Sequence, residues 1–286
     1  MDTEPGRAGD LADRSVRADA DLLLGPAWHR FLSPHFDDVS ISCGGTAALL
    51  AANDHAPEVC VIFAEGERPG PQTAFVAEQH RRWRLDAEGV IAGRRREETA
   101  AATILGTVPR FLTFPDAIYR GTRYLDDPHL FGDVAPDEAA LPAEIASALG
   151  LDRPVDPAAR VYAPLALGNH VDHQHLLRAG LDAARSGWDV WFYEDLPYGL
   201  DPATLATRLD SLERDGARLV PASSVDVSAT WRQKIDAIMC YASQVPVIFR
   251  HVTTVPSRDQ IDAAMRAYAE AMPGIPVERY WRLAPA

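Results

Sequence analysis

Short apolar runs alternate along this chain with stretches of helical periodicity, and this alternation limits the fold more than any other feature of the sequence. The run from Glu58 to Phe63, apolar after its first residue, is typical of a strand buried on both faces of a parallel sheet. Further strands are expected at 28–32, 109–114, 160–164, 188–193 and 218–227. Helices are expected at 40–53, 74–87, 90–105, 141–150, 202–215, 230–242 and 258–272, with one more that opens near residue 170.

The order of these segments predicts one α/β domain over residues 22–286. We expect it to be Rossmann-like, with a mostly parallel sheet flanked by helices on both faces. Residues 1–21 are rich in Asp, Arg, Gly and Ala without sustained periodicity, which predicts a flexible tail. The stretch 117–140 also lacks clear periodicity, and connections of this length are often lids or binding loops.

Composition narrows the class of partner. The 286 residues carry a formal net charge of −13 and a pI of about 5.1, which argues against a nucleic-acid or anionic-membrane partner. No apolar run approaches the ~20 residues that span a bilayer. Residues 1–21 lack the apolar core of a signal peptide, so we expect a cytoplasmic protein. The three cysteines, Cys43, Cys60 and Cys240, form no CxxC pair and are expected to be buried thiols.

A histidine and two carboxylates stand close together after the first expected strand, in Ser33-Pro34-His35-Phe36-Asp37-Asp38. In open α/β sheets, ligands bind at such strand-to-helix turns. His35 and Asp38 can converge on one cation, which leaves Asp37 available for proton transfer. Taken alone, so short a motif is also compatible with a polar loop that carries an Asx turn and a helix cap.

A second cluster, His170-Val171-Asp172-His173, follows the fourth expected strand and opens a helix. Because the carboxyl ends of parallel strands lie at one edge of a sheet, the two clusters can meet although they are far apart in sequence. Together they supply two histidines and an aspartate with one position left open, the form of a catalytic zinc site. His175 is expected to face solvent, and no role is expected for the remaining histidines, which are His29, His55, His80, His129 and His251.

The two clusters also resemble those of a known family. Residues 33–45, Ser-Pro-His-Phe-Asp-Asp-Val-Ser-Ile-Ser-Cys-Gly-Gly, are similar to the opening motif of the LmbE-like, or PIG-L-type, N-acetylglucosaminyl deacetylases. Residues 170–173 are similar to that family's second motif, His-x-Asp-His. Three weaker matches follow in the family's order: an Arg-x-x-Glu helix at 94–106, Phe114-Pro115-Asp116, and a late segment from Lys234 to Gln244. The resemblance covers about residues 30–245 and implies one LmbE-like domain within 22–286.

The resemblance implies a zinc-dependent deacetylase in which His35, Asp38 and His173 are the metal ligands and Asp37 is the general base. Zinc, or another divalent metal, would make hydroxide available at neutral pH.

It also implies roles for four further residues. A protonated His170 would stabilise the tetrahedral oxyanion and could protonate the leaving amine. Asp172 would orient or charge-stabilise His170. Arg94 and Asp116 would lie near the sugar hydroxyls, and a solvated helical ion pair is the alternative role for Arg94.

The chain departs from the family's commonest opening, His-Pro-Asp-Asp-Glu, because Phe36 replaces the proline and Val39 the glutamate. Neither position is an expected ligand, so these two positions are expected to bear first on substrate preference. Aromatic residues around the fifth strand are expected to be core at two or more positions, with a sugar-stacking platform as the alternative: Trp188, Trp191, Tyr193 and Tyr198.

We therefore expect an N-deacetylase of a small-molecule N-acetylated amino sugar, in a glycoside or glycolipid precursor. One alternative is a zinc hydrolase of a non-sugar amide or ester, which the same metal site would serve. Another is a catalytically silent sugar- or nucleotide-binding α/β protein, although no GxGxxG follows the first strand. The sequence leaves the acyl group, the aglycone and the oligomeric state open, with a homo-oligomer among the alternatives.

Overall fold

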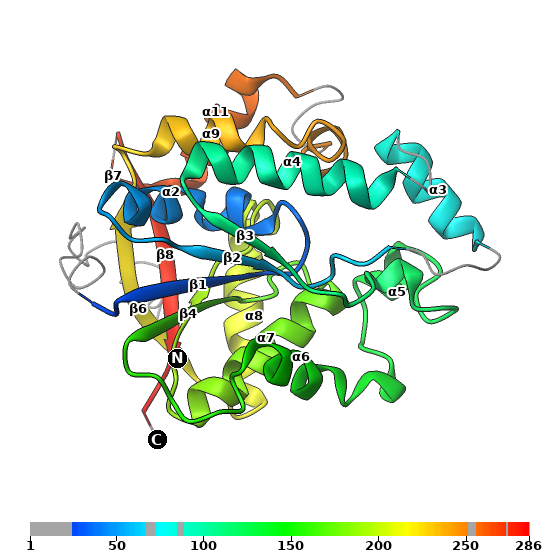
Figure 1. Cartoon of the computed structure of the whole chain (residues 1–286), viewed down its shortest axis with the longest axis horizontal. Helices are drawn as coiled ribbons and strands as arrows, with labels where there is room; N and C mark the ends of the chain where they lie inside the picture. The colour runs from blue at the N-terminus through cyan, green and yellow to red at the C-terminus, as the bar shows by residue number, and fades with distance from the viewer. Residues whose placement is uncertain (1–24, 67–71, 85–88, 251–255, 273, 286) are drawn as a thin grey trace, which may run out of the picture.

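The strands pair in the order β3-β2-β1-β4-β5-β8-β6, and β7 pairs with β8 beside this path (Figure 1). The first five strands of this order are parallel, whereas β8 runs antiparallel to both β5 and β6. Apolar residues follow one another along the central strands because helices cover both faces of the sheet. The strands are β1 (Trp28–Ser33), β2 (Glu58–Val61), β3 (Val108–Phe111), β4 (Ala159–Pro164), β5 (Asp189–Tyr193), β6 (Leu219–Asp226), β7 (Glu270–Met272) and β8 (Ile275–Leu283).

The computed structural model describes residues 25–66, 72–84, 89–250, 256–272 and 274–285. The expected tail, residues 1–21, lies outside this part of the chain, and so do residues 85–87 at the end of the expected helix 74–87.

Two layers of helices enclose the sheet (Figure 1). One apolar core lies between the sheet and α2 (Asp38–Ala52), α4 (Val90–Leu105), α9 (Trp231–Ile238) and α11 (Arg258–Ala269). A second core lies under α6 (Leu141–Leu149), α7 (Val171–Arg185) and α8 (Pro202–Arg214). Shorter elements complete the chain: α3 (Ala74–Trp83), α5 (Asp127–Leu130), α10 (Val245–Ile248) and the 3₁₀ turns η1 (Ala117–Tyr119), η2 (Pro136–Glu138) and η3 (Tyr198–Leu200).

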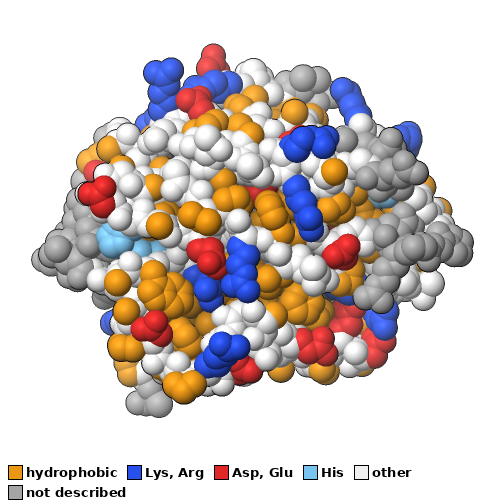
Figure 2. Space-filling model, viewed as in Figure 1, with side chains coloured by type: hydrophobic (Ala, Val, Ile, Leu, Met, Phe, Trp, Pro, Cys, Tyr) orange, Lys and Arg blue, Asp and Glu red, His pale blue; other side chains and the backbone are white. Residues whose placement is uncertain are grey.

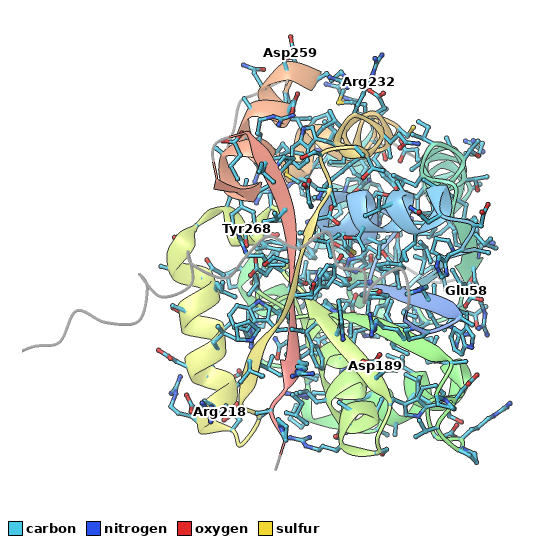
Figure 3. The ribbon with its side chains drawn as sticks, turned by 90° about the vertical axis from the view of Figure 1, so that its left-hand side faces the viewer. Glu58, Asp189, Arg218, Arg232, Asp259 and Tyr268 are labelled. Carbon is cyan, nitrogen blue, oxygen red and sulfur yellow. The ribbon has the colours of Figure 1, made fainter. Side chains whose placement is uncertain are left out.

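The predicted α/β architecture is confirmed, and the largest difference lies at the C-terminal end. The expected helix 258–272 ends at Ala269, and the apolar pair Tyr280–Trp281 belongs to β8, a strand that the sequence did not predict. Figure 3 shows this long strand beside β6. Within β8, Pro276, Glu278 and Arg279 interrupt the apolar residues, so the pattern does not show the continuous run typical of a buried strand.

The strand order reverses direction between β1 and β4. From β1 the chain moves outward to β2 and β3, and it then returns to β4 and β5 on the other side of β1. Open α/β sheets bind ligands at such a switch point, beyond the carboxyl ends of the two strands. The clusters at 35–38 and 170–173 follow β1 and β4, so the topology brings them together at this point.

Gly44 and Gly45 have a structural role, in the packing of α2 against α9 and β8. Helix α2 is kinked at Cys43, where φ is −136° and ψ is 23°, and the kink frees two backbone N–H groups. The Glu278 carboxylate accepts both, from Gly45 N at 2.9 Å and from Thr46 N at 2.7 Å. Lys234 Nζ pairs with the same carboxylate at 2.7 Å, so a buried ion pair joins α2, α9 and β8.

The exposed face in Figure 2 carries side chains of both charge signs, interspersed with apolar ones. Among the described residues, no helix is long and apolar enough to cross a membrane.

Candidate active site

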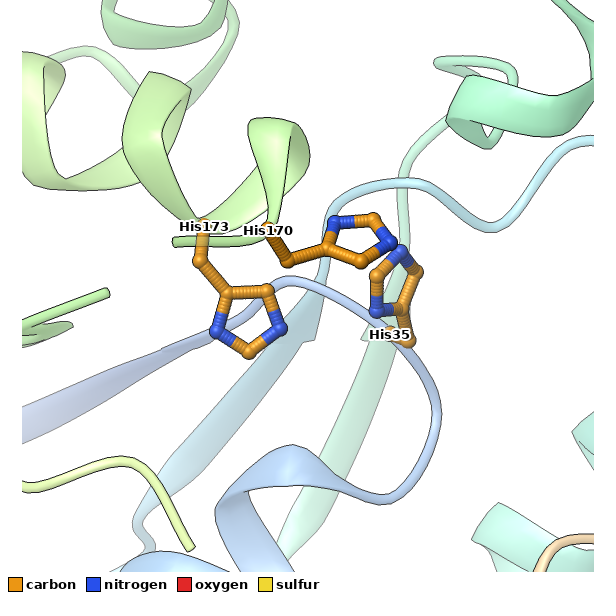
Figure 4. Close-up of side chains that lie close together, drawn as sticks. All are labelled: His35, His170 and His173. Carbon is orange, nitrogen blue, oxygen red and sulfur yellow. The ribbon is translucent and has the colours of Figure 1, made fainter. Parts of the chain in front are cut away.

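The loop after β1 and the start of α7 place three histidines within contact distance (Figure 4). The ring centroids of His35 and His170 are 4.8 Å apart, and those of His170 and His173 are 5.4 Å apart. Asp37 occupies the N-cap position of α2, but its side chain makes no capping hydrogen bond. Its Oδ2 atom is buried without a hydrogen-bond partner in the part of the chain that the structure describes. This argues against the simple capping turn that the motif alone allowed.

Asp38 lies between His35 and His173, the two histidines expected to bind a metal together with it. Its Oδ2 atom is 3.4 Å from His35 Nδ1 and 3.5 Å from His173 Nε2. These separations are long for strong hydrogen bonds. They match the spacing of about 3.4 Å between ligand atoms around a tetrahedral zinc ion with bonds of about 2.1 Å. The two separations from Asp38 to the predicted histidine ligands therefore fit a metal of this size.

Each of these histidines is backed by a carboxylate on its other ring nitrogen. Nε2 of His35 lies 2.9 Å from Asp172 Oδ2, and Nδ1 of His173 lies 2.6 Å from Asp195 Oδ1. Carboxylates in this position fix the orientation of metal-ligating imidazoles and the nitrogen that faces the metal. Here the nitrogens left over, Nδ1 of His35 and Nε2 of His173, are the two that face Asp38.

Two further groups of side chains in the described residues could hold a metal ion. The ligand atoms of His35, His170 and His173 lie within 4.8 Å of one another, as do those of His35, Asp116 and Asp172. Both oxygens of Asp172, however, are engaged: Oδ2 by His35 Nε2 and the Ala117 N–H, and Oδ1 by Arg120. Oδ2 of Asp38 accepts from the His35 backbone N–H at 2.7 Å, and it also faces Nδ1 of His35 and Nε2 of His173. We therefore favour the set that includes Asp38.

The electrostatics of the site favour a positive charge at its centre. Burial lowers the pKa of His35, but the carboxylates of Asp116, Asp172 and Asp38 outweigh burial and hold this pKa well above its usual value. The pKa of Asp38 lies below its usual value: burial acts to raise it, and the charge of His173 and hydrogen bonding to His35 outweigh that effect. A site that keeps Asp38 ionised and His35 protonated is suited to a metal cation in place of the proton.

The pKa of Asp37 is raised and that of His170 is lowered, which is the reverse of the shifts at Asp38 and His35. Burial raises the pKa of Asp37 to about 6, with the Asp38 charge adding to the rise and Arg94 opposing it. Burial and the charge of His35 hold the pKa of His170 well below its usual value, although Asp172 acts in the other direction. His170 is therefore neutral at pH 7 here, which differs from the protonated form expected from the sequence.

The contacts of Asp172 also differ from expectation. Its backbone N–H, rather than its carboxylate, lies next to His170 and donates to Nδ1 at 3.2 Å. The carboxylate binds His35, Ala117 N and Arg120 instead. Asp172 thus acts on His170 through the backbone and through its charge, and the neutral imidazole keeps its proton on Nε2.

Arg94 is buried at 5% exposure, so the expected alternative of a solvated surface ion pair is wrong. Its guanidinium lies over the rings of Phe36 at 5.0 Å and Trp83 at 5.2 Å. From there it lies 3.6 Å from Asp37 Oδ2 and 3.9 Å from Asp116 Oδ2. The structure therefore gathers both predicted substrate-binding residues beside the predicted base.

These side chains line a pocket of about 440 Å³. His35, Asp37, Asp38 and His170 lie at one side of it with Arg94 and Asp116. Apolar residues form much of the remaining wall, among them Ile41, Phe131, Leu196, Tyr198, Val247 and Phe249. Phe36 and Val39, the two departures from the family motif, are in the core and are not among the lining residues.

Of the four aromatic residues singled out near β5, three are buried in the cores and one lines the pocket. Trp188, Trp191 and Tyr193 are buried in the two cores, as expected for at least two of them. Tyr198 lines the pocket, with its ring 6.0 Å from that of His173. His175 is wholly buried with its Nε2 3.2 Å from Glu138, because the 117–140 segment covers this face of α7, so the expectation of a solvent-facing side chain is wrong.

The sequence reasoning missed two residues of the site, Asp195 and Arg120. Asp195 follows β5 at the carboxyl edge of the sheet, so its position in the chain offered the same signal as the two clusters. Arg120 belongs to the irregular 117–140 segment, where no periodicity indicates the direction of a side chain.

Proteins similar in sequence and in fold are known. Residues 30–184 match PIG-L, the GlcNAc-PI de-N-acetylase family. A 2'-N-acetylparomamine deacetylase of Streptomyces fradiae is 33% identical over 267 residues, which cover 89% of each chain. One of the same name from Niallia circulans is 32% identical over 187 residues, 59% of this chain and 66% of that one. The zinc-inhibited form of teicoplanin deacetylase Orf2 superposes with a TM-score of 0.70 at 25% identity, covering 91% of this chain and 98% of that one.

Fold, site and relatives together define the class: the protein is an N-deacetylase, an amidohydrolase that acts on a linear amide C–N bond. More particularly, the chain belongs to the PIG-L, or LmbE-like, deacetylase family. The family and the enzyme class predicted from the sequence are confirmed, and the alternative of a silent binding protein is set aside.

Proposed function

We propose that this deacetylase uses a divalent metal, zinc in the first instance, to remove the acetyl group from the amino sugar of a small glycoside. The observation that carries the proposal is the position of Asp38 Oδ2, 3.4 Å from His35 Nδ1 and 3.5 Å from His173 Nε2. Both histidines present to Asp38 the nitrogen that is not used by a supporting carboxylate. His35, Asp38 and His173 would hold the metal.

Metal bound there would act as a Lewis acid on the amide carbonyl and lower the pKa of an adjacent water. Asp37 would accept the proton of that water as it attacks the carbonyl carbon. A general base works best when its pKa lies near the working pH, and burial places the pKa of Asp37 at about 6. Arg94, 3.6 Å from the same carboxylate, would keep it oriented toward the pocket.

His170 would donate a hydrogen bond from Nε2 to the oxyanion that forms on the carbonyl oxygen. Its Nδ1 atom accepts from the Asp172 N–H, so the neutral ring has its remaining proton on the side away from this contact. The proton that Asp37 has taken would pass to the departing nitrogen as the C–N bond breaks. The products would be acetate and the free amine.

The pocket supports a substrate larger than an acetamide. Its volume of about 440 Å³ exceeds what an acetyl group fills, and Arg94 and Asp116 offer partners for ring hydroxyls beside the base. The Streptomyces fradiae relative is a 2'-N-acetylparomamine deacetylase, so 2'-N-acetylparomamine is the first substrate to test. A non-sugar amide or ester stays the competing substrate class, and the cytoplasmic location and the oligomeric state stay predictions.

The deciding experiment combines metal analysis with a substrate panel. The protein is purified without chelator, its metal content is measured, and apoprotein is reconstituted with zinc, manganese, cobalt or nickel. The range of metals matters because the related teicoplanin deacetylase is described in a zinc-inhibited form. Amine release is then followed from 2'-N-acetylparomamine, from simple N-acetylglucosaminyl glycosides, and from N-acetylated amines without a sugar.

Asp37→Ala is the matched variant, because it removes the base and leaves the three ligands in place. It should bind metal like the wild type and lose activity by at least a hundredfold. Wild-type rates in this variant would contradict the role of Asp37. A protein that neither carries nor responds to metal would contradict the metal site, and faster turnover of the non-sugar amides would contradict the substrate class.

A further inference from the structure

Arg120 is a buried cation that the mechanism above does not use. It follows η1 in the segment 117–140, and its side chain is 7% exposed. Nη1 donates to Asp172 Oδ1 at 2.6 Å and to the Pro115 carbonyl at 3.1 Å. Its other face is occupied by Glu138, with Nε 2.7 Å from Oε1.

Arg120 completes the hydrogen bonding of Asp172. One carboxylate oxygen, Oδ1, accepts from Arg120, while Oδ2 accepts from the Ala117 N–H at 3.0 Å and lies 2.9 Å from His35 Nε2. Asp172 is 0% exposed, so water cannot replace a lost partner without rearrangement of the site. The direction of the carboxylate, and with it the ring of His35, is therefore set by Arg120 and the Ala117 backbone.

The segment that carries Arg120 is itself tied down. The Glu138 carboxylate accepts from Arg120 and from the Tyr124 hydroxyl at 2.7 Å, and it lies 3.2 Å from His175 Nε2 on α7. The guanidinium lies 5.2 Å from the ring of Phe63, next to β2. Contacts from three parts of the chain thus hold Arg120 in one place.

We infer that Arg120 is a positioning residue of the metal site: it holds Asp172 against His35, so that Nδ1 of His35 faces Asp38. The inference rests on the proposed metal site, and it assigns to the 117–140 segment a role in metal binding through Asp172. A lid is therefore an incomplete description of this segment.

The test measures metal affinity, which does not depend on turnover. Zinc affinity of wild type and variants is determined by competition with a chromophoric chelator, and folding is checked by circular dichroism and thermal unfolding. Arg120→Lys keeps the charge but cannot bind Asp172 and Glu138 with a planar fork. It should weaken zinc binding by about tenfold or more, as is typical when a supporting partner of a metal ligand is lost.

Arg110→Lys is the matched control. Arg110 lies in β3, its side chain is 41% exposed, and it pairs with Glu58 at 3.6 Å rather than with a residue of the 117–140 segment. We expect its zinc affinity to stay within twofold of the wild type. Glu138→Gln separates the positioning role from the stability of the segment. It weakens the contacts of Glu138 with Arg120, Tyr124 and His175 but leaves the pair of Arg120 with Asp172. We therefore expect a lower unfolding temperature and little change in zinc affinity.

The outcomes are distinct. If Arg120→Lys folds and binds zinc like the wild type, Arg120 has only a structural role and the inference is overturned. If Arg120→Lys and Glu138→Gln lose stability equally and neither loses zinc affinity, it is overturned as well. A wild-type protein that binds no metal would overturn the proposed metal site itself.

Discussion

The carboxylate of Asp195 lies 2.6 Å from Nδ1 of His173, and both side chains are buried. Asp195 follows β5 and His173 lies in the first turn of α7, so the contact joins the carboxyl ends of two neighbouring strands. Its other oxygen accepts from the Leu167 backbone N–H at 3.2 Å, which fixes its direction. The pair therefore determines which nitrogen His173 offers to a metal.

Asp195→Asn should weaken metal binding without unfolding the protein. An amide can orient either its oxygen or its NH₂ group toward Nδ1, so the preference for the nitrogen facing Asp38 is lost. We expect metal affinity to fall by about tenfold to a hundredfold. Competition titration with a chelator measures this directly.

Asp189→Asn is the control for this change, because Asp189 lies at the amino end of β5, whereas Asp195 follows its carboxyl end (Figure 3). It pairs with Arg160 at 2.8 Å and its side chain is 42% exposed. Unchanged metal affinity in Asp195→Asn would show that the orientation of His173 does not depend on the carboxylate of Asp195.

Arg94→Lys should impair substrate binding and turnover together. A guanidinium can contact the rings of Phe36 and Trp83 and still direct N–H groups toward Asp37 and Asp116, and an ammonium cannot do both. We expect kcat/KM to fall by about tenfold or more, equivalent to about 1.4 kcal/mol of transition-state stabilisation. Steady-state kinetics on the best substrate of the panel provide the measurement.

The neighbouring Arg96→Lys serves as the comparison, since Arg96 is exposed on the same helix. Equal kinetics in both variants would argue against a substrate-binding role for Arg94.

Phe36 can affect the site indirectly. Its ring packs against the Arg94 guanidinium and does not line the pocket, so any effect of Phe36 on substrate preference would depend on the position of Arg94.

Sequence patterns predicted the parts of this site that directly follow a recognisable strand. The two His/Asp clusters follow buried strands, and parallel strands present their carboxyl ends at one edge, so their meeting follows from topology. Asp195 obeys the same rule and could have been predicted from its place after β5. Arg120 could not, because the direction of its side chain depends on how an irregular segment folds over α7.

Protonation and burial were harder to predict than position. The neutral state of His170 arises from burial and from its neighbour His35, which sequence spacing does not show. The burial of His175 depends on Glu138, 37 residues away, and on the segment that carries it. Strand β8 was missed for a related reason, since its pairing with β5 and β6 is antiparallel and long-range.

His29, remote from the site, should contribute to loss of stability in acid. It is buried with Nδ1 3.0 Å from the Tyr162 hydroxyl, and burial, with the charges of His55 and Arg160, lowers its pKa to about 4 from 6.5. Below pH 6.5 the unfolded chain takes up a proton that the folded protein does not. The stability from this group is therefore complete above pH 6.5 and is lost as the pH falls toward 4, by at most about 1.4 kcal/mol per pH unit.

Urea unfolding of metal-free protein at pH 7 and pH 5 measures this effect. His29→Gln removes the titrating group, so its unfolding free energy should fall less between the two pH values than that of the wild type. The exposed His129→Gln should follow the wild type. Parallel pH dependence in the wild type and His29→Gln would exclude His29 as a source of the acid sensitivity.

Gly44 and Gly45 offer a matched test of the kink in α2. A Cβ atom at Gly45 would lie 2.7 Å from Val227 Cβ and 3.0 Å from Glu278 Oε1, whereas one at Gly44 would meet its nearest neighbour at 3.5 Å. Gly45→Ala should therefore push α2 away from the carboxylate that binds Gly45 N and Thr46 N, and lower the unfolding free energy by about 1–3 kcal/mol. Gly44→Ala should be neutral or slightly stabilising, since alanine favours a helix by up to about 1 kcal/mol. Because Asp37 and Asp38 lie at the start of the same helix, Gly45→Ala should also reduce kcat, and equal stability of the two variants would show that the kink does not depend on Glu278.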